Sequence, residues 1–230
     1  MKLTVLGCNG PYPEPGGACS GYLLQDEDTN ILLDCGSGVL AQLEKILPPE
    51  RLTAVILSHL HYDHMSDMLP MVYRCPGLKV YLPGEPSQVR QLLEGAFDLQ
   101  DIARGGRVGK LCMQSCPGRH PVPSYAVRIE NAAGKSFVYT GDTNTCAALA
   151  DFAKDCDFLL ADGCFSVSQW QENKPHLSAC LAGELAAQAR AKALMVTHFT
   201  PGYDANLLLQ EAKKAYPAAC LAQMGLTVEV

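Results

Sequence analysis

The chain lacks a long apolar run and has no excess of positive charge. No stretch of its 230 residues approaches the roughly 20 consecutive apolar residues that a membrane-spanning helix needs. The net charge of −6 argues against a broad surface for long polyanions such as nucleic acids. The opening residues, MKLTVLGC, have no signal-peptide pattern. These observations predict a cytoplasmic protein whose partners include neither membranes nor long nucleic acids.

Paired cysteine motifs are also missing, although cysteine itself is abundant. The chain has 11 cysteines, an odd number, and none of them forms a C-x-x-C motif. Several, including Cys35, Cys156 and Cys180, lie in apolar stretches. This pattern is typical of reduced thiols in a cytoplasmic protein, and a disulfide framework is the alternative.

Linkers and low-complexity segments are absent from the sequence as well. A length of 230 residues suits one domain with a large core. We therefore expect a single domain over residues 1–230. Residues 1–117 and 118–230 also resemble each other weakly, since each half has strands, then polar residues at strand ends, then helices.

Apolar patterning predicts an alternation of strands and helices. Strands are expected at residues 2–6, 20–25, 30–34, 53–58, 78–82, 111–116, 124–129, 136–140, 157–162, 194–197 and 226–230. Helices are expected at residues 38–47, 65–72, 86–97, 144–154, 178–191 and 205–215. The basic stretch at residues 104–110 could meet a phosphate or form a solvated surface loop.

Histidine is scarce, yet three of the six histidines fall within residues 59–64, HLHYDH. The buried strand expected at residues 53–58 precedes this segment and a helix follows it, so we expect a loop held by rigid elements on both sides.

On such a loop, His59 and His61 can turn to one side while Asp63 and His64 turn to the other. Imidazole and carboxylate groups are common metal ligands, and two pairs of them suit two metal ions better than one. The alternative is a chance cluster of surface histidines.

The segment HLHYDH resembles the signature of the metallo-β-lactamase superfamily, the αββα metallo-hydrolases, and later motifs match in order over essentially the whole chain. The resemblance implies an α/β (α+β) fold, a four-layer αβ/βα sandwich in which two mixed β-sheets are flanked by helices. It places the functional site at one edge of the sandwich, where strand ends from both halves meet.

Three later motifs are similar to those of the ribonuclease Z-like branch. His120 stands in an H-x-x-P-S-Y context, Asp142 stands in a GDT segment, and His198 ends a segment that begins with a His-x-Ser helix start at His176. The resemblance implies that one metal ion binds His59, His61, His120 and Asp142. It implies that a second binds Asp63, His64, Asp142 and His198, with Asp142 as the bridge.

The implied chemistry is hydrolysis at two divalent ions. Two ions about 3.5 to 4 Å apart lower the pKa of a shared water and hold the entering and departing oxygens. Nitrogen and oxygen ligands suit zinc, with manganese or iron as substitutes. Asp34 is expected to brace the ligand loop through hydrogen bonds, as a similar Asp does in the family; a helix N-cap is the alternative for it.

Two features of the resemblance favour phosphodiester hydrolysis. Redox members of the superfamily have a carboxylate where this chain has His61, and the GDT segment together with His176 is typical of phosphodiesterases. The family resemblance also indicates a proton donor. Ribonuclease Z pairs a Glu with the histidine of the His-x-Thr helix to protonate the leaving group. Here Asp162 stands in place of that Glu, so Asp162 and His176 form a hypothetical proton-donating pair. The candidate catalytic residues are therefore Asp63, Asp162 and His176.

The substrate is expected to be small. Transfer-RNA-processing members carry a long arm between the third histidine motif and the GDT segment, whereas His120 and Asp142 are only 22 residues apart (142 − 120). We expect a small phosphodiester or cyclic nucleotide, and a homodimer by family analogy. The alternatives are an acyl hydrolase of the same fold, acting on a thioester or lactone, and a metal- or nucleotide-binding protein without catalysis.

Overall fold

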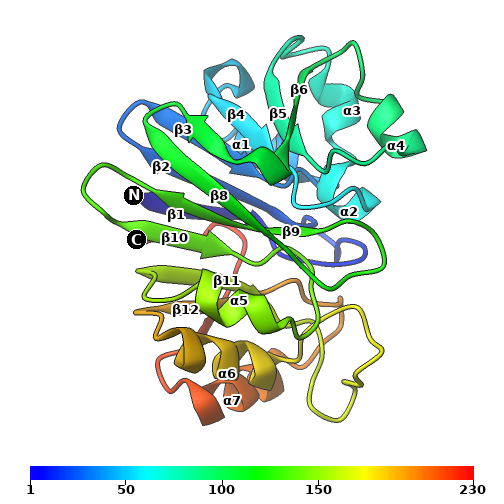
Figure 1. Cartoon of the computed structure of the whole chain (residues 1–230). Helices are drawn as coiled ribbons and strands as arrows, with labels where there is room; N and C mark the ends of the chain where they lie inside the picture. Colours follow the sequence, from blue (N-terminus) through cyan, green and yellow to red (C-terminus); the bar gives the residue numbers. More distant parts are fainter.

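Two seven-stranded sheets form the middle of the molecule, as the computed structural model of residues 1–230 shows (Figure 1). The first sheet has the order β14 (Thr227–Glu229), β1 (Lys2–Gly7), β2 (Gly21–Asp26), β3 (Thr29–Leu33), β4 (Ala54–Ile56), β5 (Lys79–Leu82), β6 (Asp98–Asp101). The second has the order β13 (Cys220–Leu221), β12 (Leu194–Thr197), β11 (Phe158–Asp162), β10 (Ser136–Tyr139), β9 (Tyr125–Glu130), β8 (Leu111–Pro117), β7 (Gly106–Val108).

Both sheets are mixed, and they are built in the same way. In the first, the pairs from β14 to β3 are antiparallel and those from β3 to β6 are parallel. In the second, the pairs from β7 to β10 are antiparallel and those from β10 to β13 are parallel. The two halves therefore do not divide at residue 117, because β7 and β8 belong to the second sheet and the C-terminal β14 returns to the first. Both chain ends consequently lie on the same side in Figure 1.

Helices cover the outer face of each sheet. Those over the first sheet are α1 (Val39–Leu43), α2 (Tyr62–Met65), α3 (Met68–Met71) and α4 (Gln88–Gln91), with the 3-10 turn η1 (Pro49–Arg51). A second 3-10 turn, η2 (Ile102–Arg104), packs against β8, and its Ile102 enters the core between the sheets. Those over the second are α5 (Ala147–Phe152), α6 (Ala179–Ala189) and α7 (Ala205–Ala215), at the foot of Figure 1. The expected four-layer sandwich is confirmed. No helix is long and apolar enough to cross a membrane.

Apolar side chains fill three layers, as the two-residue period of strands requires. On β10, Phe137 and Tyr139 enter the core between the sheets, whereas Val138 points to the core beneath α5, α6 and α7. On β1, Leu3 and Val5 enter the central core, and Leu6 points to the core beneath the helices of the first sheet. Each sheet is therefore apolar on both faces. Packing on both faces holds the strands in place, and with them the polar residues at the strand ends.

The sequence placed most elements within a few residues, and the helix after the histidine motif is the main error. A helix was expected at residues 65–72, but α2 begins at Tyr62, inside the motif, and α3 follows a break. Pro70 explains the break, because a proline ring clashes with the carbonyl four residues earlier, here that of Ser66. The expected loop at residues 59–64 is thus helical in its second half.

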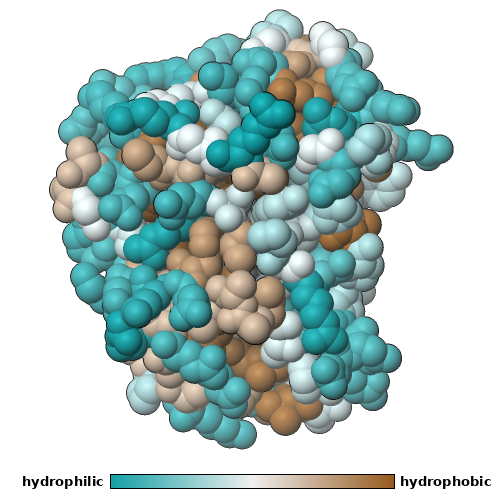
Figure 2. Space-filling view, viewed as in Figure 1, coloured by the Kyte–Doolittle hydropathy of each residue, from teal (hydrophilic) through white to brown (hydrophobic).

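Other helices are shorter than expected. The helices predicted at residues 38–47 and 86–97 shrink to α1 and α4 and continue as turns, and the strands β6, β7 and β13 were not predicted. On the face shown in Figure 2, apolar side chains gather over the region of α5 and α6. A shallow groove of about 270 Å³ there is lined by residues such as Ala150, Leu181 and Leu185.

Candidate metal centre

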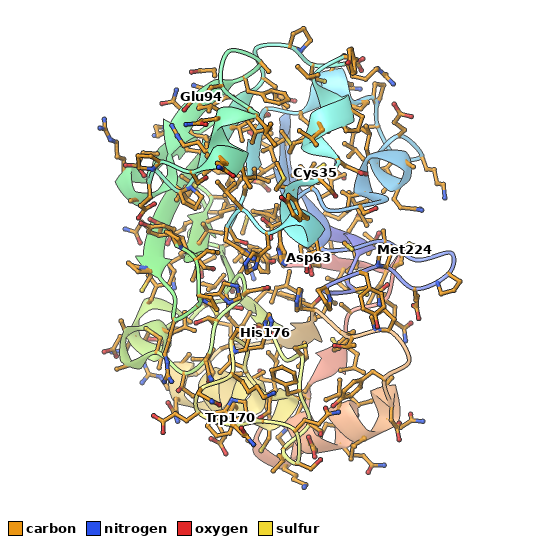
Figure 3. The ribbon with its side chains drawn as sticks, turned by 90° about the vertical axis from the view of Figure 1, so that its right-hand side faces the viewer. Cys35, Asp63, Glu94, Trp170, His176 and Met224 are labelled. Atoms are coloured by element: carbon orange, nitrogen blue, oxygen red, sulfur yellow. The ribbon has the colours of Figure 1, made fainter.

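All six histidines of the chain gather at one edge of the sandwich. Parallel strands bring them there, since the carboxyl ends of such strands meet at a common edge. His59 and His61 follow β4, Asp142 follows β10, Asp162 ends β11 and His198 follows β12. This edge faces the viewer in Figure 3, where Asp63 and His176 lie near the middle of the molecule.

The remaining side chains come from the connections. Asp63 and His64 lie in the first turn of α2, which starts directly after His61. His120 lies between β8 and β9, and His176 lies shortly before α6. Residues from five separate connections of the chain therefore meet at this site.

Three imidazole nitrogens converge in the first ligand group. His61 Nδ1 lies 3.1 Å from His59 Nε2 and 3.1 Å from His120 Nε2. Asp142 completes the group, and its four ligand atoms all lie within 4.8 Å of one another. A tetrahedral zinc ion bound at about 2.0 to 2.1 Å separates its ligand atoms by roughly 3.3 Å. The spacing of these nitrogens therefore fits a single shared ion.

The second group shares Asp142 with the first. Asp142 Oδ2 lies 3.2 Å from His64 Nε2 and 3.4 Å from His198 Nε2. Asp63 Oδ2 lies 3.5 Å from His64 Nε2 and 3.8 Å from His198 Nε2. The structure thus brings all seven predicted ligand residues into two groups that share one carboxylate. The first group is His59, His61, His120 and Asp142, and the second is Asp63, His64, Asp142 and His198.

The donor set also fits cations on electrostatic grounds. Burial lowers the pKa of four imidazoles, so their lone pairs are free to bind a cation. These are His59, His61, His120 and His198. Two buried polar atoms, His64 Nε2 and Asp142 Oδ1, have no hydrogen-bond partner. Buried polar atoms are nearly always satisfied, so these two are suited to bind a cation.

His64 differs from the other four predicted ligand histidines in the direction of its pKa shift. Burial would lower the pKa of His64, but the carboxylates of Asp142 and Asp34 outweigh it and raise this pKa well above the usual value. A proton on His64 and a bound cation would each balance the negative charge of the same carboxylates. Binding of a divalent ion at His64 Nε2 would therefore displace a proton.

In four of the histidines, the ring nitrogen Nδ1 forms a hydrogen bond to another group of the protein, and Nε2 remains for a ligand. Such bonds fix the orientation of ring ligands. The partners are the Ser58 hydroxyl for His59, the Asp34 carboxylate for His64, the Pro175 carbonyl for His120 and the Ser20 hydroxyl for His198, at 2.8 to 3.1 Å. Each partner leaves the other ring nitrogen directed at the ligand groups.

Asp34 connects the two sheets beneath the site. Its Oδ1 accepts the amide of Ser58 at 2.7 Å, and its Oδ2 accepts the hydroxyls of Ser58 and Tyr139 and the His64 ring nitrogen. Tyr139 belongs to β10 of the opposite sheet. The bracing that the family resemblance implied is therefore made by hydrogen bonds, and no helix N-cap involves Asp34.

Local backbone geometry at the site is unusual. Asp34 and His198 have positive φ angles of 56° and 67°. Non-glycine residues in this region are sparse and gather at functional sites. A Cβ on Gly10 would lie 2.0 Å from the His198 ring, so only glycine lets the loop at residues 7–19 pack on that ligand.

Asp162 and His176 form a pair at the rim of the ligand groups. His176 Nδ1 lies 2.9 Å from Asp162 Oδ2 and 3.7 Å from Asp142 Oδ2. Burial would lower the pKa of His176, but Asp162 and Asp142 outweigh it and raise the pKa to about 9. The Thr143 amide also donates to Asp162, which fixes the carboxylate. Both carboxylates therefore favour the protonated form of the His176 imidazole.

Some candidate residues lie away from the site. Asp67 accepts the Leu40 amide at the start of α1 and contacts no ligand histidine. In the basic stretch, Arg104 pairs with Asp101. Lys110 pairs with Glu27 near the β2–β3 turn, at the end of β8 that is opposite to His120. Ser20, Ser58 and Tyr139 were not singled out by the sequence, because a serine or tyrosine within an apolar strand gives no local signal of a polar contact across the fold.

Comparison with known proteins agrees with this geometry. A sequence profile described as "Beta-lactamase superfamily domain" matches residues 29–199. A probable metallo-hydrolase, YhfI of Bacillus subtilis, is 31% identical over 94% of this chain and 94% of its own. A ribonuclease Z of Methanosarcina acetivorans is 24% identical over 100% of this chain and 98% of its own.

Solved structures show the same fold. The crystal structure of Bacillus subtilis YhfI covers 100% of this chain and 99% of its own, at 30% identity, with a TM-score of 0.93. The human short form of tRNase Z covers 100% of this chain and 99% of its own, at 19% identity, with a TM-score of 0.83. The latter likeness concerns the fold alone.

Proposed function

The chain belongs to the metallo-β-lactamase superfamily, and we propose that it is a binuclear, zinc-dependent phosphodiesterase acting on a small phosphodiester such as a cyclic nucleotide. One observation carries the proposal: two groups of histidine and aspartate ligands share Asp142, whose Oδ1 has no partner in the protein. A carboxylate can bind two ions with its two oxygens.

In this proposal the ligands divide between two ions in the way that the family resemblance implies. His59, His61 and His120 would hold one ion, and Asp63, His64 and His198 the other, with Asp142 between them. When bound, two such ions acidify a shared water and neutralise charge on the phosphoryl oxygens. The nitrogen-rich first group favours zinc over magnesium or calcium.

His176 supplies the second part of the reaction. Hydrolysis forms a bond from the water oxygen to phosphorus and breaks the bond to the leaving oxygen, which then takes a proton. Asp162 holds His176 Nδ1, so Nε2 is the nitrogen that gives this proton to the leaving oxygen. Asp63, a carboxylate of the second group, is the candidate acceptor for the proton of the attacking water. The ribonuclease Z among the relatives supports this assignment of the reaction.

The size of the substrate follows from charge and topology. The net charge is −6, and in the basic stretch that the sequence singled out, Arg104 pairs with Asp101 and Lys110 pairs with Glu27. Only a short connection joins His120 to Asp142, and β9, β10 and the turn between them occupy most of it. We therefore expect a small molecule rather than long nucleic acid, a cytoplasmic location, and a homodimer by family analogy.

Hydrolysis of bis(p-nitrophenyl) phosphate tests the proposal. Metal-free protein is reconstituted with zinc or with manganese, bound metal is counted, and Asp142→Asn protein serves as the blank. Turnover by the wild type and none by the blank would support a metal-dependent phosphodiesterase. Two bound ions without phosphodiester turnover, together with cleavage of thioesters or lactones, would replace it with the acyl-hydrolase reading. Binding of metal and nucleotide without any hydrolysis would leave the binding-protein reading.

A further inference from the structure

A cavity of about 300 Å³ opens beside the metal centre. His61, a member of the first ligand group, is part of its wall. Ligand pockets in proteins measure about 300 to 1,000 Å³, so this one lies at the lower limit and suits a single ring system. A substrate whose phosphorus lies at the metal centre would place one of its substituents in this cavity.

Three segments build the cavity, and most of their side chains are apolar. Leu60 and Tyr62 flank His61, Val89 comes from α4, and Val122 follows His120 closely in the chain; three prolines, Pro83, Pro86 and Pro123, complete the wall. The Tyr62 side chain is 70% exposed, so its ring is open to contact. Aromatic and proline surfaces of this kind favour flat, uncharged groups.

Glu85 is the one acidic side chain in the wall, and no lysine or arginine accompanies it. The hydroxyl of Tyr125, which is buried, donates to Glu85 Oε1 at 3.2 Å and anchors the carboxylate. An ionised carboxylate only accepts hydrogen bonds, and it repels anions. Glu85 therefore selects for donors and against a second phosphate or a carboxylate.

We propose that this cavity holds one substituent of the phosphodiester, a flat uncharged group whose edge donates N–H bonds to Glu85, as an amino-bearing nucleobase does. The proposal rests on the phosphodiesterase function proposed above. In this arrangement Tyr62 stacks on the ring and Glu85 recognises the exocyclic amino group. A base that lacks the amino group leaves Glu85 without that partner.

The test compares substrates that differ by one amino group. Two pairs are used: 3′,5′-cyclic GMP with cyclic IMP, and cyclic AMP with the cyclic phosphate of purine riboside. In at least one pair, loss of the amino group should lower kcat/KM of the wild type about 10-fold or more, the worth of a hydrogen bond to a charged group. Glu85→Gln protein should reduce that ratio below about 3-fold, because a neutral amide accepts more weakly.

Controls separate recognition from folding and from the metal centre. Glu94→Gln makes the same chemical change at an exposed glutamate that does not line the cavity and is labelled in Figure 3, so it should keep the wild-type ratio. Bis(p-nitrophenyl) phosphate offers no N–H donor, so its hydrolysis by each variant reports on the fold and the metal centre separately from recognition of the amino group. Tyr125→Phe, which removes the anchor of Glu85, should lower the amino-group ratio only in part.

The outcomes distinguish this proposal from the function beneath it. Wild-type turnover of bis(p-nitrophenyl) phosphate with no amino-group dependence, or with a dependence that Glu85→Gln preserves, overturns the cavity assignment and leaves the phosphodiesterase standing. If no phosphodiester is hydrolysed, the same pairs are compared by calorimetric binding to the zinc-loaded protein. Equal affinities within each pair would then remove the cavity assignment as well.

Discussion

Two buried aspartates occupy equivalent places in the two sheets but are satisfied in opposite ways. Asp34 follows β3 and Asp142 follows β10, and each of these strands joins the antiparallel to the parallel part of its sheet. Asp34 accepts four hydrogen bonds, whereas Asp142 has one oxygen without a partner and the other facing imidazoles. The first carboxylate is complete within the protein, and the second is complete only with cations.

This difference separates the structural from the functional half of the site. The protein donors around Asp34 lower the free energy of the folded chain whether or not metal is present. Asp142 is buried without such donors, which costs free energy in the metal-free chain and directs it to bind cations. Substitutions at the two positions should therefore affect stability and activity in opposite proportions.

Asp142→Asn is the change with the largest expected effect on activity. The amide keeps the shape of the side chain but removes the charge between the two ligand groups. We expect phosphodiesterase activity to fall by at least about 10³-fold, roughly 4 kcal/mol, the size reported for loss of a central electrostatic group. The urea-unfolding free energy of the metal-free protein should fall by less than it does in Asp34→Asn protein, because Asp142 Oδ1 accepts no hydrogen bond within the protein. A metal-free protein destabilised as strongly as Asp34→Asn would contradict the comparison.

Asp34→Asn should show the reverse balance. Its amide presents donors to the Ser58 amide, a hydroxyl or the His64 ring, so buried donors face one another. We expect the unfolding free energy of the metal-free protein to fall by about 3 kcal/mol. Zinc affinity should fall by about 10- to 100-fold, as for other residues that orient metal ligands. Urea denaturation and competition with a chelating dye measure the two quantities.

Asp162 extends the comparison to a third carboxylate. It holds His176 at 2.9 Å much as Asp34 holds His64 at 2.8 Å, but His176 lies outside the two groups of predicted ligands. His176→Ala should therefore leave zinc content unchanged. It should lower kcat about 100-fold for a substrate with an alkyl alcohol as leaving group and less than about 5-fold for one with p-nitrophenolate. Equal losses on both substrates would assign His176 a positioning role only.

The sequence identified the predicted metal ligands but not the groups that orient them. The spacing of His59, His61, Asp63 and His64 and their resemblance to a known signature were visible because these residues are close in the chain. Tyr139 and Asp34 are 105 residues apart, and Ser20 and His198 are 178 apart. Contacts of that separation depend on strand pairing across two sheets, which no local pattern encodes.

The same limit explains the errors in the fold. The strands and long helices α6 and α7 followed from apolar periodicity and from caps such as Ser178, whose hydroxyl accepts the Leu181 amide. The short helices α1 to α4 depend on packing against the first sheet rather than on propensity, so their ends were misjudged. The shift of α2 into the histidine motif matters most, because it places Asp63 and His64 on one helical turn.

Asp157→Asn tests a satisfied carboxylate at the other end of β11, far from the metal centre. Burial would raise the pKa of Asp157, but bonds from Lys192, the Ser136 amide and Lys135 outweigh it and lower the pKa. The folded protein therefore binds fewer protons here than the unfolded chain, whose Asp pKa is about 3.9, so the stabilisation is present above that pH and is lost as the pH falls below it. We expect Asp157→Asn to lower the free energy of unfolding by about 1 kcal/mol at pH 7, a value discounted for the exposed lysines, and by progressively less as the pH falls toward 2.

Asp155→Asn, at an exposed pair with Arg190, is the control and should lower the free energy of unfolding by less. Zinc-dependent activity should stay at the wild-type level in both proteins. A cost that grows as the pH falls would contradict this sign and the description of Asp157 as a carboxylate satisfied within the protein.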